Sequence, residues 1–193
     1  RPLFFAGKRP KRSRHSRHKV AFFHFRYYEP AFKYFTEQVL DADFVPTPTP
    51  TRATIKRGEE MSADYVCTPF KHIIGDYAAA LEQGADTLVQ VTGFCRLNYY
   101  GELQEMILRD AGYEHFQMLN FSYVATGKIR DYVAYCKKVV NPNLSIPHGV
   151  KNLLGAYRMV EHIDTFRDRY LANAGFETEP GSFARVRKEF LSA

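Results

Sequence analysis

The sequence has no apolar run that approaches the roughly 20 residues needed to cross a bilayer. Its N-terminal charges are not followed by an apolar segment with a small-residue cleavage site, so a secretory signal peptide is not expected. Three cysteines form an odd and sparse set, which argues against a disulfide framework and suits a reducing compartment. We therefore expect a soluble, cytoplasmic protein.

The first 19 residues contain no acidic side chain and eight of the 27 Lys and Arg residues. Because the net charge of the whole chain is +6, the remainder is slightly acidic. We predict a basic, flexible tail over residues 1–18. A solvated extension is the commoner role for such a tail, and the alternative is a contact with an acidic partner, nucleic acid or anionic lipid.

The sequence also lacks the P-loop, GxSxG and HExxH patterns, which argues against an ATPase or hydrolase that acts by itself. Glu102 and Glu105 are the candidate carboxylate pair for acid/base chemistry. On a predicted helix they are expected to form a solvated face instead. The sequence therefore leaves the catalytic residues unassigned.

Strand and helix patterns alternate from residue 19 onward. Short apolar runs predict strands at 19–25, 42–50, 86–91 and 115–121. Residues spaced for one helical face predict helices at 29–40, 69–83 and 98–113. In the clearest of these helices, Thr68 is the expected N-cap, Pro69 the first helical residue and Gly84 the stop. This alternation predicts a parallel sheet with helices on both faces.

The strand signals fade after Lys128. Helices are expected at 128–139 and about 150–173, separated by the Asn- and Pro-rich segment 141–149. We therefore predict an α/β three-layer domain of flavodoxin- or Rossmann-like type at 19–125. A helical extension at 126–193 is expected to pack on this domain.

Two cysteines precede predicted helices. Cys67 comes directly before Thr68-Pro69, and Cys95 lies between the strand at 86–91 and the helix at 98–113. Parallel sheets bind ligands where strands lead into helices, and free N–H groups at a helix start favour a thiolate. Lys71 and Arg96 add positive charge nearby.

Two interpretations of these cysteines are open. They are buried core residues, or they converge on one metal centre. Spacing alone favours the core, because there is no CxxC pair and the histidines are scattered. A zinc site would need four Cys or His ligands close together.

A family resemblance favours the metal centre. The segments "CTPFKHIIGDYAAALEQGADTLV" and "GFCRLNYYGELQEMILRDAGY" resemble the 2-hydroxyacyl-CoA dehydratase family and its CoA-enzyme activase relatives. The similarity covers roughly residues 19–121. Its two motifs are Cys-x-Pro-x-Lys, at Cys67, Pro69 and Lys71, and Cys-Arg-x-x-x-Tyr-x-x-x-Gln, which begins at Cys95-Arg96 and includes Tyr100 and Gln104.

The resemblance implies an oxygen-sensitive iron–sulfur cluster of the [4Fe–4S] type. Cys67 and Cys95 match the family's ligand positions, and Lys71 and Arg96 would offset the charge of the cluster. In the family, an ATP-driven activator delivers one electron, and the cluster-bearing component removes water from a 2-hydroxyacyl-CoA through a ketyl radical. The implied partners are such an activator or a second dehydratase-like subunit, with an acyl-CoA substrate, in an oligomer.

The chain departs from the family in length and in its third cysteine. Family enzymes are usually longer and supply a third cysteine from a further α/β half, so this chain is expected to be a short member or a fragment. Cys136 lies within a predicted helix and is expected to be core rather than ligand. A second subunit, water or substrate would then complete the cluster. The alternative is a non-catalytic α/β binding module whose basic tail docks an acidic partner or nucleic acid.

Overall fold

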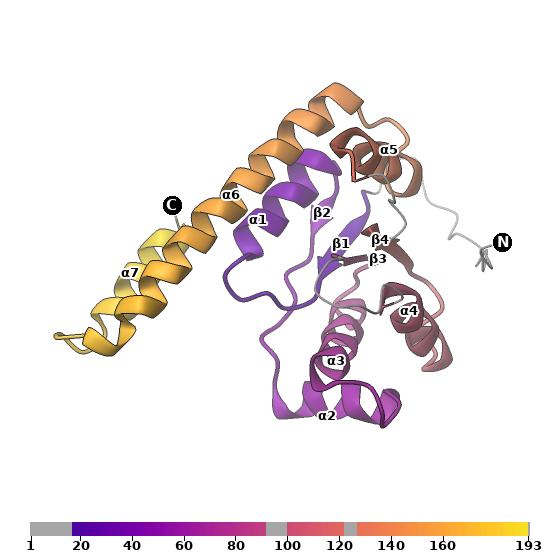
Figure 1. Ribbon diagram of the computed structural model, residues 1–193. Helices are drawn as coiled ribbons and strands as arrows, with labels where there is room; N and C mark the ends of the chain where they lie inside the picture. The colour runs from indigo at the N-terminus through magenta and orange to yellow at the C-terminus, as the bar shows by residue number, and fades with distance from the viewer. Residues whose placement is uncertain (1–16, 92–99, 122–126, 193) are drawn as a thin grey trace.

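A computed structural model describes residues 17–91, 100–121 and 127–192 of the chain. Within these ranges, four short strands form one parallel sheet in the order β2-β1-β3-β4 (Figure 1). They are β1 (Lys19–Phe22), β2 (Asp43–Phe44), β3 (Thr87–Gln90) and β4 (Gln117–Asn120). The register pairs Ala21 with Leu88 and Leu88 with Met118. The predicted parallel α/β fold is therefore confirmed.

Helices cover both faces of this sheet, because successive strand residues point to opposite sides. Val20 and Phe22 lie in one hydrophobic core, which packs under α1 (Glu29–Tyr34), its π-helical continuation η1 (Phe35–Val39), α5 (Ile129–Val139) and α6 (Ile146–Asn173). Ala21 and Phe23 lie in the other core, under α3 (Thr68–Glu82) and α4 (Tyr100–Asp110). The result is a three-layer domain.

The helix α3 begins one residue earlier than the sequence predicts. Cys67, not Thr68, is the N-cap, with an extended backbone (φ −70°, ψ 154°), and its carbonyl accepts the first helical hydrogen bond from the Lys71 N–H. Pro69 still lies in the first turn, where no N–H is needed. The helix ends as predicted before Gly84, whose φ of 90° suits a residue without Cβ.

The helix α2 (Arg52–Met61) was not predicted. It begins at a capping box in which Thr54 N–H donates to the side chain of Thr51. It then packs across α3 at two glycines, Gly58 and Gly75, where an added Cβ would meet backbone atoms of the other helix. Packing against α3, more than an apolar stripe of its own, holds α2 in place.

The C-terminal helices differ from expectation at both ends. The helix α6 begins at Ile146 instead of about residue 150, because Pro147 is accommodated in its first turn. A further helix, α7 (Ser182–Ser192), was not predicted. It follows the short 3₁₀ helix η3 (Ala174–Phe176).

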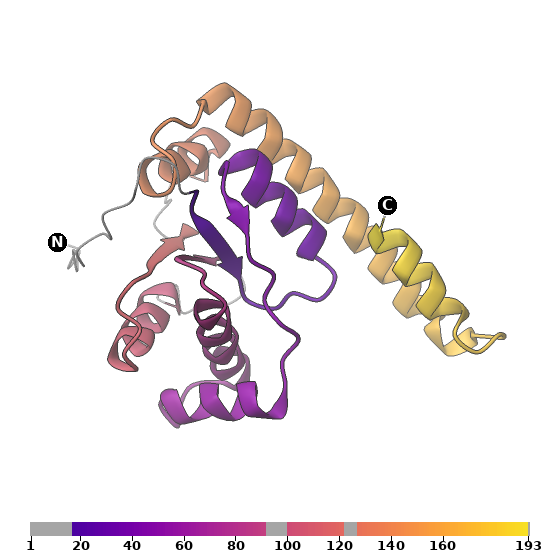
Figure 2. The same ribbon diagram turned by 180° about the vertical axis from the view of Figure 1, so that it is seen from behind.

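The second half of α6 extends past the sheet, and α7 runs back along it (Figure 2). The rings of Phe166 and Phe190 stack at 3.9 Å between centroids and hold this helix pair together. Arg167 and Asp164 on α6 bind the hydroxyl of Tyr28 in the loop after β1. Within the described ranges, no helix has the length and apolar character needed to cross a membrane.

Candidate functional site

The strand order defines where a ligand would bind. The chain moves from β1 to its outer neighbour β2, and from β3 to its outer neighbour β4 on the other side. Ligands of open α/β sheets bind at such a switch point, beyond the carboxyl ends of the two central strands. Here the loop after β1 spans residues 23–28, and the segment after β3 spans 91–99. Cys95 and Arg96 belong to that second segment and lie outside the described residues.

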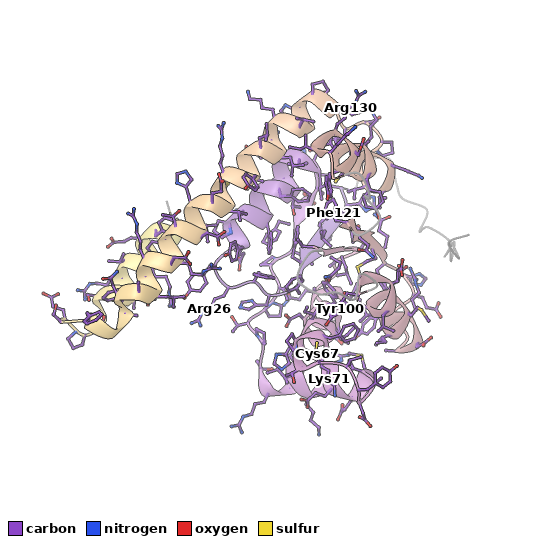
Figure 3. The ribbon with its side chains drawn as sticks, viewed as in Figure 1. Arg26, Cys67, Lys71, Tyr100, Phe121 and Arg130 are labelled. Atoms are coloured by element: carbon purple, nitrogen blue, oxygen red, sulfur yellow. The ribbon has the colours of Figure 1, made fainter. Side chains whose placement is uncertain are left out.

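Cys67 and Tyr100 bring the starts of α3 and α4 together. The Sγ atom of exposed Cys67 and the hydroxyl oxygen of Tyr100 are 2.9 Å apart and form a hydrogen bond. The Tyr100 ring meets Phe70, in the first turn of α3, edge-on at 5.0 Å between centroids. Figure 3 labels Cys67, at the start of α3, next to its partner Tyr100 on α4, and Lys71 on α3. A thiol and the first turn of each helix therefore share one site.

This environment favours the thiolate of Cys67. The hydrogen bond from the Tyr100 hydroxyl lowers the pKa of the Cys67 thiol, and the backbone N–H of Phe70 acts in the same direction. Partial burial raises the pKa and only partly offsets these bonds. Because the thiolate is both the nucleophile and the metal ligand, Cys67 is suited to act as either.

Two cations lie at the same edge of the domain. The Nζ atom of half-buried Lys71 lies 3.5 Å from the carbonyl oxygen of Asp64. Arg26 is exposed in the loop after β1 (Figure 3). Within the described part of the chain, neither side chain forms an ion pair with a carboxylate. Both charges are therefore available to an anionic ligand.

Cys136 lies elsewhere. It is 1% exposed and belongs to the core under α5 and α6, on the opposite face of the sheet from α3. Burial raises the pKa of its thiol to about 12. The structure therefore does not bring Cys136 together with Cys67.

Sequence analysis did not select Asp76, which is buried beside the loop after β1. It is 3% exposed, and its Oδ2 accepts a hydrogen bond of 3.0 Å from the backbone N–H of His24. Its Oδ1 has no hydrogen-bond partner among the described residues. Burial raises the pKa of this carboxyl, and the nearby His24 and His72 oppose that effect. The sequence signal that could have identified Asp76 was its charge beside the apolar stripe of the helix predicted at 69–83.

Gln104 is a second buried polar group near the site. It lies one turn after Tyr100 on α4 and is fully buried. Neither polar atom of its side-chain amide is hydrogen-bonded within the described segments. The resemblance included Gln104 in its motif, but no pattern in the sequence indicated that its amide is buried. Such an amide is available to a neighbouring loop or ligand.

The described residues supply one thiol donor at this edge of the sheet, Cys67. In the ranges that the structure covers, no group of three or more His, Cys, Asp or Glu side chains is arranged to hold a metal ion. The chemistry of Cys67 fits a cluster ligand, since its thiolate is favoured and its sulfur is exposed. Completion of a cluster requires donors from outside these residues.

Comparison with known proteins found no match to this chain among family models, curated proteins or solved structures.

Proposed function

We propose that the chain is an iron–sulfur-cluster-binding component of a redox system of the 2-hydroxyacyl-CoA dehydratase type. Cys67 and Cys95 would be cluster ligands. The observation that carries the proposal is the position of Cys67, at the start of α3, where a hydrogen bond from Tyr100 favours its thiolate. The parallel fold supports it, because the segment that contains Cys95 leads from the central strand β3 to Tyr100.

The surrounding residues suit a negatively charged cluster. Lys71 lies in the first turn of α3 and carries a positive charge. The N-termini of α3 and α4 add the partial positive charges of their helix dipoles. Further ligands would come from a second subunit, water or substrate. A bound cluster of this kind accepts and passes on single electrons at low potential. The chain's own part is to hold sulfur ligands and to offset the charge of the cluster.

Partners follow from the same proposal. An ATP-dependent activator or a second dehydratase-like subunit would exchange electrons with the chain in an oligomer. Arg26 and Lys71 would bind the phosphates of an acyl-CoA substrate, since they form no ion pairs with described carboxylates. The sparse cysteine content supports a reducing, cytoplasmic location for this activity.

Anaerobic reconstitution with iron and sulfide tests the proposal. The wild-type chain should become brown, whereas Cys67→Ser and Cys95→Ser should lose most of this visible absorbance. Cys136→Ser is the matched control, because its thiol is buried in the other core, and it should reconstitute like wild type. Wild-type protein that stays colourless would contradict the proposed function.

A further inference from the structure

The Tyr100 hydroxyl is placed by packing from two helices. Tyr100 is the first residue of α4 and is half-buried. Its ring lies edge-on against Phe70, which is 1% exposed and fixed in the core under α3. The hydroxyl reaches Cys67 Sγ at 2.9 Å from this fixed ring. The contact therefore depends on the packing of α3 against α4 and not on a freely rotating side chain.

The direction of the hydrogen bond between Tyr100 and Cys67 depends on whether the sulfur carries a proton. A cysteine that ligates iron carries no proton, so the Tyr100 O–H is the donor and Sγ the acceptor. A donor to a ligand sulfur withdraws electron density from the cluster. Reduction adds negative charge, so the hydrogen bond stabilises the reduced state more than the oxidised state. Hydrogen bonds to the sulfurs are among the factors that set cluster potentials.

We propose that Tyr100 is a positioning residue that raises the reduction potential of a cluster held by Cys67. This inference rests on the proposed function, because it needs the cluster. It assigns the Tyr100 hydroxyl an electronic role and no part in holding iron. Lys71 lies in the first turn of α3, after Cys67, but its charge acts through space, whereas the Tyr100 hydroxyl acts at the ligand atom itself.

Tyr100→Phe removes the hydroxyl and keeps the ring that packs on Phe70. The test is a redox titration of the anaerobically reconstituted protein, followed by electron paramagnetic resonance. The midpoint potential of Tyr100→Phe should shift to a more negative value than that of wild type. The matched control is Tyr113→Phe, whose lost hydroxyl bonds Arg57 and Glu82 instead of Cys67. That variant should keep the wild-type potential.

The outcomes separate this inference from the proposed function. Wild-type protein without a cluster would overturn both. A cluster whose potential is the same in wild type and Tyr100→Phe would overturn the role of Tyr100 alone. A Tyr100→Phe protein that does not fold, judged by circular dichroism, or that holds no iron would also contradict the inference, because the hydroxyl would then have a structural or binding role.

Discussion

Replacing Gly58 with alanine should force α2 away from α3. At this helix crossing, an added Cβ would lie 1.9 Å from the carbonyl oxygen of Lys71 and 2.9 Å from the amide nitrogen of Gly75. Both atoms belong to the backbone, so no side-chain rotation relieves the overlap. Since non-bonded heavy atoms pack at about 3.5 Å, α2 must move by more than about 1 Å.

Two opposing effects set the change in the free energy of unfolding of Gly58→Ala. Overpacking of a well-packed contact costs about 1–3 kcal/mol, and contact with rigid backbone places Gly58→Ala at the upper end of that range. Alanine is favoured over glycine inside a helix by about 1 kcal/mol. We therefore expect a net loss of about 2 kcal/mol in the free energy of unfolding. The movement would also displace residues 62–66, which join α2 to Cys67.

Urea unfolding followed by circular dichroism measures this loss. Gly155→Ala in α6 is the matched control, since its added Cβ would meet the ring and hydroxyl of Tyr34 at 2.8–3.3 Å, a side chain that can shift. That variant should be close to wild type in stability or somewhat more stable. A Gly58→Ala protein as stable as wild type would refute the close packing of α2 on α3.

Three further predictions concern buried and reactive groups. Iodoacetamide should alkylate Cys67 at a pH below the ordinary thiol range, because the pKa of its thiol is lowered. Cys136 should stay unmodified until the protein unfolds, because it is 1% exposed with a pKa of about 12. Peptide mapping that finds equal alkylation rates would contradict the environments described for the two thiols. Tyr77→Phe should lower the free energy of unfolding by about 1–3 kcal/mol, because the Tyr77 hydroxyl donates to the Val89 carbonyl and the Gln90 side chain in the core. Tyr157→Phe is the control, because this side chain is 60% exposed, and it should change the free energy of unfolding little. Equal losses of stability in the two variants would count against the buried hydrogen bonds of Tyr77. Burial raises the pKa of Asp76 above its ordinary value of 3.8, so its contribution to stability is complete below that pH and is lost as the pH rises through the folded-state pKa. Relative to Asp76→Asn, the wild-type free energy of unfolding should therefore fall as the pH rises from below 3.8 through the raised folded-state pKa, and a constant difference would contradict the raised pKa.

The sheet and most of its helices were predictable because burial leaves a periodic trace in the sequence. The residues of β3 are all buried, and the segment 86–91 accordingly carries the apolar residues Leu88, Val89 and Val91 with the β-branched Thr87 before them. The helix α2 leaves no such trace. Its buried contact is Gly58, a residue with low helix propensity, so its position depends on α3 and not on its own pattern.

The candidate site was predictable in part for the same reason. The Pro69 turn and the Gly84 stop indicate a helix directly after Cys67, so the thiol could be placed at a helix start. Its contact with Tyr100 could not, since the two residues are 33 positions apart and meet through tertiary packing. The burial of Asp76 likewise depends on the loop after β1, which no local pattern places against α3.

Iron and acid-labile sulfide, measured per chain after anaerobic reconstitution, test the central proposal most directly. Wild-type protein is expected to hold both in equal amounts, and Cys67→Ser is expected to lose most of both while it keeps its helical circular dichroism spectrum. Wild-type protein without iron, or a folded Cys67→Ser variant that retains the full content, would contradict the assignment of Cys67 as a cluster ligand.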